Sequence, residues 1–312
     1  MPKGKAIALI KTFIEKTYAK KGPQVVAKNF AAVDATLAHL FEVVRPDEGL
    51  DASDKRAEKI GYVDERAPTF VKRVTAEMMS GRGDLIPVSQ LPDDGTYPTG
   101  TSKWEKRSVA QRIPEWHEDL CIQCGNCSLI CPHAAIRAKF YHSDWLDGAP
   151  EGAKSAAISA RGFPNTRYTL QVFPDDCTGC GLCVQACPVH AEPGPAETAT
   201  LRAINMVDKE PILDREQTAL AWYQDLPIND RSRVDFSTVR GVQFLEPLFE
   251  FSSACAGCGE TPYLKVLTQL FGDRMMVANA TGCSSIYGGN LPTTPWTVNE
   301  EGRGPAWSNS LF

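Results

Sequence analysis

The chain has 312 residues, of which 43% are hydrophobic and 23% are charged, so it is long enough for two or more globular units with buried cores. This composition excludes a fully disordered chain. The formal net charge is −5, with acidic and basic residues mixed along the sequence, so no basic footprint for a nucleic-acid partner is present.

The N-terminus, MPKGKAIALIKTFIEKTY, has no long apolar stretch and no small-residue cleavage site, so it is not a secretory signal. No other stretch is long and apolar enough for a membrane span, and we expect no membrane partner. We therefore place the protein in the cytoplasm, where thiols stay reduced. In that compartment the eleven cysteines are interpreted as metal ligands and not as disulfides.

Two amphipathic helices are predicted within residues 1–44, separated by Lys21 and Gly22. Apolar residues recur at helical spacing in two sets, Ile7, Ile10, Ile14 and Tyr18, and then Val33, Leu37, Leu40 and Phe41. Residues 45–108 are rich in Pro, Gly and Asp and include VSQLPDDGTYPTGTSKWEKR. This composition predicts an extended connector, broken by turns, that wraps over other domains.

One internal repeat lies in the middle of the chain. CIQCGNCSLICP at 121–132 matches CTGCGLCVQACP at 177–188 in every cysteine position. Residues 141–165, between the two runs, are expected to be an insertion with little regular structure. RYTLQVFP, which follows this insertion, alternates like a strand that places Tyr168, Leu170 and Val172 on one face.

Each of these runs has the CxxCxxCxxxCP form that binds [4Fe-4S] clusters. Three cysteines of a run wrap one cluster, and the fourth reaches the other cluster. The crossed pattern predicts one cluster on Cys121, Cys124, Cys127 and Cys187, and a second on Cys177, Cys180, Cys183 and Cys131. Zinc also accepts CxxC pairs, but two full runs of four that end in proline favour the clusters. The sequence therefore predicts a two-cluster (bacterial-type) ferredoxin-like domain that moves single electrons.

The residues around the cysteines support this interpretation. Gly125 and Gly181 follow the second cysteine of each run, where a side chain would obstruct a loop that turns its amides toward sulfur. Pro132 and Pro188 end the loops. Apolar residues are expected to shield the clusters from water, namely Ile122, Ile130, Ile136, Leu182 and Val184. His133 and His190 follow the last cysteines, and we expect both to face solvent.

A different pattern begins after the second run. ILDREQTALAWYQDL at 212–226 predicts a helix, and from Gly241 onward a turn and a second helix are followed by a short buried strand, Met275 to Ala278. This strand leads into a glycine-rich turn. Strand, turn and helix in this order suggest an open α/β sheet with a ligand at the carboxyl end of the strand.

Three cysteines remain outside the two runs, Cys255, Cys258 and Cys283. An ordinary [4Fe-4S] cluster takes four cysteine ligands, so one ligand is missing from this set. Either a group other than cysteine completes the site, or the fourth thiolate lies outside this chain.

The whole sequence resembles the pyruvate:ferredoxin (flavodoxin) oxidoreductases, which are large multidomain thiamine-diphosphate enzymes. The most specific segments are CIQCGNCSLICPHAAIRAK, CTGCGLCVQACP, PLFEFSSACAGCGETPYLKVLTQLFGDRM and NATGCSSIYGGNLPTTPWTVNEEGRGPAWSNSLF. Enzymes of this family oxidatively decarboxylate pyruvate on thiamine diphosphate, transfer the acetyl group to coenzyme A, and pass electrons along three [4Fe-4S] clusters to ferredoxin or flavodoxin. The resemblance also implies Mg²⁺ as the metal that holds the diphosphate, and a homodimeric parent enzyme.

The resemblance implies an α+β multidomain fold in four parts. Residues 1–44 resemble the end of the coenzyme A-associated domain, and 45–108 the connecting domain with its WEKR segment. Residues 109–240 resemble the ferredoxin-like domain, and 241–312 the beginning of the α/β thiamine-diphosphate-binding domain.

The resemblance also assigns roles to residues of the last part. Cys255, Cys258 and Cys283 match three ligands of the cluster nearest the thiamine cofactor, whose fourth ligand comes from farther downstream. Glu260, Thr281, Gly282 and Ser284 match positions between that cofactor and this cluster, where a glycine turn at a helix start can point amides at a diphosphate.

Other parts of the family pattern are missing. The pyruvate-binding domains, most of the coenzyme A domain and the GDG-type motif for Mg²⁺ and diphosphate are not in the sequence, and no catalytic residue is assigned. We therefore expect an internal fragment of the enzyme that carries the electron relay and does not catalyse the full reaction alone. The alternative is a separate electron-transfer subunit of a 2-oxoacid oxidoreductase.

Overall fold

The computed structural model describes residues 2–42, 63–191, 201–290 and 292–309. The chain divides into two compact units, residues 1–59 and 60–312, and each is described by itself. Within the described residues, no helix combines the length and apolar character that crossing a bilayer requires.

The first unit is a pair of helices. α1 (Lys3–Tyr18) and α2 (Pro23–Ala38) are joined by a 3-10 turn, Ala19–Lys21, and by Gly22, whose φ of 100° only glycine adopts readily. Lys11 Nζ lies 2.7 Å from Asp34 Oδ1 and links the two helices. Both predicted helices are confirmed, but the prediction was wrong for Leu40 and Phe41. The backbone leaves the helical region at His39, so these two side chains lie past α2 and are 66% and 80% exposed.

The second unit begins with the connector, of which residues 63–108 are described. A helical segment that the sequence did not predict runs from Val71–Thr75, in π-helical form, into α3 (Ala76–Met79). Three 3-10 turns follow, at Gly83–Leu85, Val88–Gln90 and Ser102–Trp104. The connector contacts sequence-distant segments, since Ser102 Oγ donates to the Glu250 carbonyl at 2.8 Å and the Ser108 amide donates to the Asp175 carbonyl at 3.1 Å.

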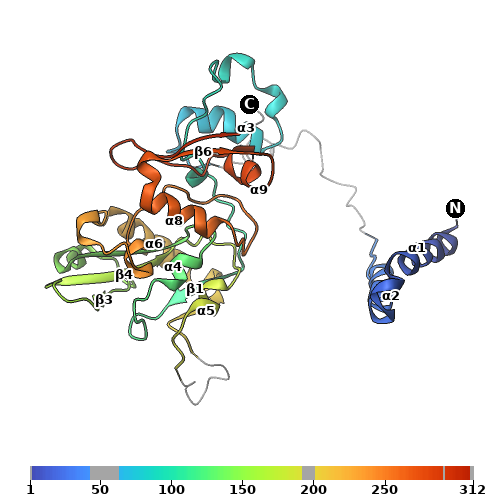
Figure 1. Cartoon of the computed structure of the whole chain (residues 1–312), viewed down its shortest axis with the longest axis horizontal. Coiled ribbons are helices and arrows are strands. Elements are labelled where there is room, and N and C mark those ends of the chain that lie inside the picture. Colours follow the sequence, from blue (N-terminus) through green and yellow to red (C-terminus); the bar gives the residue numbers. More distant parts are fainter. Residues whose placement is uncertain (1, 43–62, 192–200, 291, 310–312) are drawn as a thin grey trace, which may run out of the picture. The chain divides into compact units, whose positions relative to one another are not determined.

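The cysteine-rich part is built on two small antiparallel sheets (Figure 1). β1 (Arg112–Trp116) pairs with β5 (Ile204–Asp208), and a second sheet has the order β2 (Ile136–His142), β4 (Thr166–Val172), β3 (Ala156–Ala157). The predicted strand is thus confirmed as β4. Its buried face carries Tyr168, Leu170 and Val172, each 3% exposed or less. The insertion between the repeats contains a 3-10 turn, Ser143–Gly148, and the two-residue β3, in agreement with the prediction of little regular structure.

Helices cover these sheets. Two short helices, α4 (Asn126–Ile130) and α5 (Leu182–Ala186), carry cysteines of the two runs and contact each other. The predicted long helix is confirmed as α6 (Leu213–Asp225), preceded by a 3-10 turn at Glu210–Ile212. Its Trp222 and Tyr223 pack on Phe173 and Phe251. A 3-10 turn, Arg231–Arg233, and α7 (Val239–Val242) lead onward.

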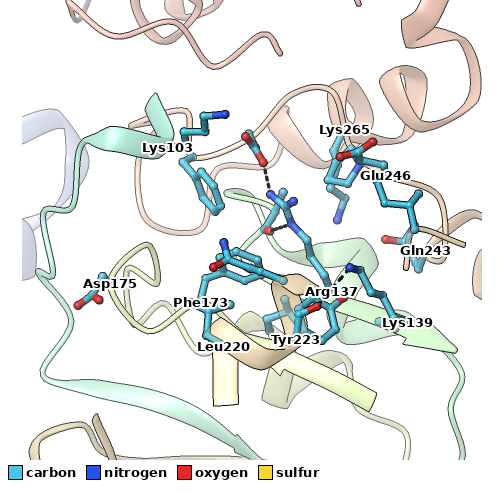
Figure 2. Close-up of a pocket in the computed structure, with 18 of the residues that line it drawn as sticks. Lys103, Arg137, Lys139, Phe173, Asp175, Leu220, Tyr223, Gln243, Glu246 and Lys265 are labelled. Atoms are coloured by element: carbon cyan, nitrogen blue, oxygen red, sulfur yellow. Dashed lines mark hydrogen bonds and ion pairs between the residues drawn. The ribbon is translucent and has the colours of Figure 1, made fainter. Parts of the chain in front are cut away.

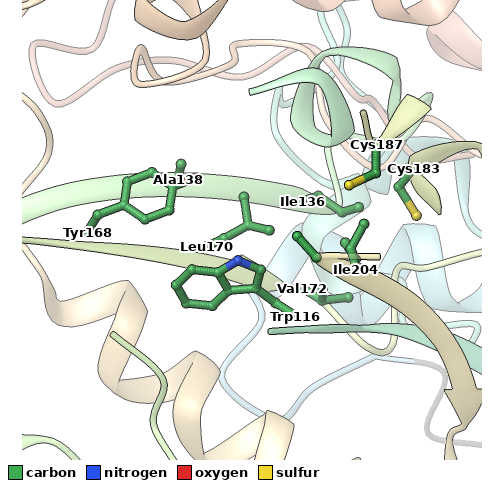
Figure 3. Close-up of a cluster of buried hydrophobic side chains, with 10 residues drawn as sticks. Trp116, Ile136, Ala138, Tyr168, Leu170, Val172, Cys183, Cys187 and Ile204 are labelled. Carbon is green, nitrogen blue, oxygen red and sulfur yellow. The ribbon is translucent and has the colours of Figure 1, made fainter. Parts of the chain in front are cut away.

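One hydrophobic core contains both sheets and two of the cysteines. Trp116, from β1, packs with Leu170 and Ile204, while Cys183 and Cys187 lie at one side of this cluster near Ile136 and Ile204 (Figure 3). The thiols therefore border the main core and are not placed on surface loops.

The C-terminal part is a smaller α/β arrangement. α8 (Thr261–Phe271) is followed by a 3-10 turn, Gly272–Arg274, then β6 (Met276–Asn279), α9 (Cys283–Ser285), a π-helical turn, Ile286–Asn290, and β7 (Ala306–Asn309). β6 and β7 are parallel, and α8 contacts α4 (Figure 1). The strand is confirmed, but its predicted burial is wrong. Met276 is 89% exposed, because β6 has only β7 as a neighbour among the described strands.

Candidate metal centres

The two cysteine runs fold into matching loops. The residues that begin α4 and α5, Gly125 and Gly181, have φ values of 80° and 75°, which confirms the reason for glycine at these positions. Each helix ends on a cysteine, Cys131 or Cys187, in extended conformation, as a residue that precedes proline prefers.

The repeats differ at the residue directly before the second cysteine of each run. Gly179 occupies this position in the second run with a φ of 70°, whereas Gln123 adopts a φ of 57° in the first run. The strained glutamine is held by hydrogen bonds to the insertion: its Nε2 donates to the Ala157 carbonyl at 2.7 Å and its Oε1 accepts from the Ser159 amide at 2.9 Å. Glutamine in the first run and glycine in the second therefore both adopt a positive φ at this position.

This geometry directs backbone amides to sulfur. The Gln123 amide donates to Cys121 Sγ at 3.3 Å, and the Gly179 amide donates to Cys177 Sγ at 3.4 Å. Amide hydrogen bonds to cysteine sulfur stabilise thiolate charge and help to set the potential of an iron–sulfur cluster. The loops thus provide equivalent polar contacts at the start of both runs.

Two narrow cavities divide the eight cysteines between them. The first cavity is lined by four cysteines, Cys121, Cys124, Cys127 and Cys187, together with Trp116, Tyr168 and Ile204. The second cavity is lined by the other four, Cys131, Cys177, Cys180 and Cys183, together with Ile136, Thr178 and Leu182. In each cavity three thiols come from one run and the fourth comes from the other run.

Burial favours the protonated form of several of these thiols in the absence of metal. It raises the pKa of Cys127 and of Cys177 to about 12, and it also raises the pKa of Cys183. Neighbouring thiols also raise these pKa values. Among the cysteines, Cys131 of the other run has the largest effect on both Cys177 and Cys183. A metal that takes thiolates from these cavities must therefore displace protons.

Unpaired polar atoms point to a group that both cavities can accept. Within the described part of the chain, the buried Thr178 hydroxyl has no hydrogen-bond partner, and the buried Trp116 indole N–H has only the Cys121 sulfur beside it. Burial raises the pKa of Cys121, and the Trp116 indole opposes this rise. No three His, Cys, Asp or Glu side chains among the described residues converge as a single metal ion requires. A [4Fe-4S] cluster does not need that convergence, because each cysteine binds a different iron atom.

The surrounding residues correct two expectations. Ile122 lines the first cavity but is 58% exposed, so it shields that site only in part, whereas Ile136 is 4% exposed and lines the second cavity. His133 is buried and not solvent-facing, because it lies on the second cavity wall and its carbonyl accepts from the Phe251 amide at 3.0 Å. Burial lowers the pKa of His133 to about 4. His190 is exposed, as expected.

The remaining three cysteines lie outside the two cavities and are more exposed to solvent. Cys255 and Cys283 are exposed and Cys258 is half-buried. Cys258 closes a turn by donating its amide to the Cys255 carbonyl at 3.0 Å. At the centre of this turn, a Cβ on Gly257 would lie 4.0 Å from Cys180 Cβ. The turn therefore adjoins the second cavity.

The residues matched to thiamine contacts surround the same area. Glu260 precedes α8 and is exposed, and Thr281 and Gly282 are exposed at the carboxyl end of β6. Ser284, in α9, is half-buried. Sequence reasoning missed Tyr287, which is 4% exposed and whose pKa is raised by burial and by Glu260, Cys258 and Cys283. Tyr287 is therefore a neighbour of Glu260, Cys258 and Cys283.

A larger cavity of about 730 Å³ is lined by residues of the connector, β2, α6 and α8 (Figure 2). At its centre Arg137 forms an ion pair with Glu250, and its guanidinium lies over the rings of Phe173 and Phe251, 4.7 and 5.0 Å from their centroids. Lys139 Nζ donates to the Tyr223 carbonyl at 3.2 Å. No periodic pattern along the chain indicates these pairs, because their partners are distant in sequence.

Comparison with known families supports the cysteine pattern. Residues 120–191 match the family described as a 4Fe-4S dicluster domain, and residues 56–110 match a domain of unknown function named EKR. The chain therefore contains a ferredoxin-like domain of the two-cluster type within a mixed α/β structure.

Curated relatives align with the whole chain. It is 52% identical to a pyruvate-flavodoxin oxidoreductase of Nostoc sp., 49% to that of Trichormus variabilis, and 45% to a pyruvate:ferredoxin oxidoreductase of Moorella thermoacetica. These alignments cover 100% of this chain but 25 or 26% of each relative. The resemblance to the pyruvate:ferredoxin (flavodoxin) oxidoreductases is thereby confirmed, and the chain corresponds to a region with about a quarter of their length.

Proposed function

We propose that this chain is the electron-relay region of an enzyme that oxidatively decarboxylates pyruvate to acetyl-CoA and CO₂. The observation that carries the proposal is the division of eight cysteines between two cavities, each with three thiols of one run and one of the other. A crossed set of four thiolates is the ligand arrangement of a two-cluster ferredoxin.

The ligand assignment follows the cavities. Cys121, Cys124, Cys127 and Cys187 hold one [4Fe-4S] cluster, and Cys177, Cys180, Cys183 and Cys131 hold the other. When bound, these clusters supply one-electron redox chemistry. The chain's own residues position the thiols, donate amide hydrogen bonds from Gln123 and Gly179, and exclude water with Trp116 and Ile136.

We assign Cys255, Cys258 and Cys283 as three ligands of a third cluster. The contact of Gly257 with Cys180 supports a spatial order in which this set adjoins the second cavity. The first cavity then lies at the far end of the series. There the exposed side chain of Ile122 offers an apolar contact for a ferredoxin or flavodoxin acceptor, the partners that the relatives' names indicate.

The rest of the reaction belongs to the proposal as well. Residues 241–312 contribute to a thiamine-diphosphate domain, with Glu260, Thr281, Gly282 and Ser284 near the cofactor and Mg²⁺ held elsewhere. The parallel pair of β6 and β7, with Cys283 after the carboxyl end of β6, supports an α/β site at that edge. We further propose that pyruvate and coenzyme A are the substrates of the parent enzyme. We propose that this enzyme is a homodimer located in the cytoplasm.

Anaerobic purification of the 312-residue chain tests the central part. We expect iron and sulfide for two clusters, a brown colour that dithionite bleaches, and paramagnetic signals from two reduced clusters that interact. A variant with alanine at both Cys124 and Cys180 is the control and should lose the colour. Stoichiometric zinc without visible absorbance in the unmodified chain would contradict the proposal.

A further inference from the structure

A buried lysine links the C-terminal part to the ferredoxin-like domain. Lys265 lies in the middle of α8, is 2% exposed, and donates from Nζ to the carbonyl of Ser128 and, at 3.0 Å, to that of Leu129. Both carbonyls belong to the last turn of α4, where an ammonium group is favoured by the unsatisfied carbonyls and the helix dipole.

The contact of Lys265 with α4 lies between cysteines that line the two cavities. α4 contains Cys127, which lines the first cavity, and is followed directly by Cys131, which lines the second. The ammonium of Lys265 therefore sits against α4, one of the two short helices that join the cavities, the other being α5. Burial lowers the pKa of Lys265 to about 8, while Cys131 and, to a smaller extent, Cys127 oppose this change.

Other buried cations near the cavities are neutralised by carboxylates. Arg137 pairs with Glu250, and Lys209 Nζ lies 3.6 Å from Asp175 Oδ1. Within the described part of the chain, Lys265 bonds only carbonyl oxygens and has no carboxylate partner. Its charge therefore acts on its surroundings without local cancellation, and burial protects it from screening by salt.

We propose that Lys265 is a positioning residue that raises the reduction potential at both cluster sites by holding one buried positive charge at the helix between them. Reduction adds a negative charge to a cluster, and a nearby cation stabilises that added charge. The inference rests on the proposed function, because it requires that both cavities hold clusters.

The chain offers a matched control in Lys139. This residue is also a partly buried lysine that caps a helix, with Nζ donating to the carbonyls of Tyr223 and Leu226 at the end of α6 (Figure 2). Burial lowers the pKa of Lys139, and the charged groups that act on it most are Glu246 and Arg137, with no cysteine among them. Lys265→Met and Lys139→Met therefore remove the same kind of cap at different distances from the cysteines.

The test is a redox titration of the loaded 312-residue chain, followed by paramagnetic resonance. We expect lower midpoint potentials at both clusters in Lys265→Met and unchanged potentials in Lys139→Met. Lys265→Gln, which retains a hydrogen-bond donor without the charge, should shift the potentials in the same direction. Lys265→Arg should keep them near those of the unmodified chain.

Unchanged potentials in Lys265→Gln with full iron content would overturn the inference, even if Lys265→Met assembles poorly. Equal shifts in the Arg and Gln variants would also overturn it, because they would show a packing effect without a role for charge. Either result leaves the clusters themselves in place. Failure of the proposed function is recognised separately, by the absence of two cluster signals from the unmodified chain.

Discussion

The two four-cysteine cavities and the three-cysteine set show opposite degrees of enclosure. Cys183 and Cys187 are 6% and 7% exposed and border a core made by two sheets, whereas Cys255 and Cys283 are exposed. Each cavity takes walls from both repeats, so one repeat completes the site of the other. The three-cysteine set has no such reciprocal partner among the described residues. Duplication is thus the means by which a short motif becomes an enclosed site.

α8 lies between these two regions and shows the same contrast on its two faces. Its polar residues Lys265 and Gln269 are buried and bond carbonyl oxygens of α4 and of Leu245. Its apolar residues Tyr263 and Phe271 are 73% and 46% exposed. The helix therefore binds the ferredoxin-like domain through the hydrogen bonds of Lys265 and leaves apolar side chains exposed.

The largest expected difference between the regions is thiol reactivity. In the cluster-loaded chain, Cys255 and Cys283 should react rapidly with iodoacetamide, while Cys127 and Cys183 should resist it. In the loaded chain the Cys127 thiolate is bound to iron, and without metal, burial and the neighbouring thiols raise its pKa from 9.0 to about 12, which reduces the thiolate fraction roughly a thousandfold at neutral pH. Mass spectrometry of digested samples measures the rates. Rapid modification of Cys127 in protein with full iron content would remove the distinction between enclosed and open sites.

Glycine substitutions sharpen the comparison at the level of the backbone. Gly179 and Gly257 have φ values of 70° and 75°, but a Cβ on Gly179 would lie 3.1 Å from the Arg112 carbonyl oxygen. At Gly257 the nearest atom, of Leu182, would be 3.7 Å away. We expect Gly257→Ala to lower the free energy of unfolding by about 1 kcal/mol and Gly179→Ala by about 3 kcal/mol. Equal shifts of the urea midpoint would show that the enclosed loop is no more tightly packed.

A smaller effect concerns an ion pair that braces the enclosed region. Glu115, in β1, lies 2.6 Å from Arg215 Nη2 and 3.1 Å from Lys154 Nζ. Burial raises the pKa of Glu115, but the hydrogen bonds from these two cations outweigh it and the pKa is lowered. Glu115→Gln should therefore cost about 1 kcal/mol of stability at neutral pH.

The pH dependence gives the sign of this effect. Because the folded-state pKa lies below the unfolded value of about 4.3, the contribution of Glu115 is present above that value and is lost as the pH falls through the folded pKa. Thermal melts of both proteins between pH 7 and acid should converge. Glu301→Gln, which removes the exposed partner of Arg303, is the control and should leave stability unchanged. A difference that persists in acid would contradict the role of the carboxylate.

Sequence reasoning succeeded where a local pattern carries the geometry. Cysteine spacing, Gly125, Gly181 and the alternation of β4 each follow from neighbours along the chain, and the structure agrees with them. It failed where tertiary packing decides, as with buried His133 and exposed Ile122. Their exposure depends on which segments cover them, and no local periodicity records this.

Polar contacts between residues far apart in the chain also could not be predicted from the sequence. Lys265 reads as a solvent-facing lysine of an amphipathic helix, yet it is buried against α4, more than a hundred residues earlier. Tyr287 likewise gave no signal beside Cys283. Its neighbours Glu260 and Cys258 approach it only through the fold.

Crossed ligation is the central claim, and single cysteine variants test it most directly. Cys131→Ala should damage the cluster of Cys177, Cys180 and Cys183 and spare the cluster formed by its own run, because the Cys131 thiol lines the second cavity. Cys187→Ala should have the reciprocal effect. Paramagnetic resonance of the reduced variants distinguishes the two clusters. The account predicts loss of the signal from the opposite run in each variant, and loss confined to the variant's own run would contradict it.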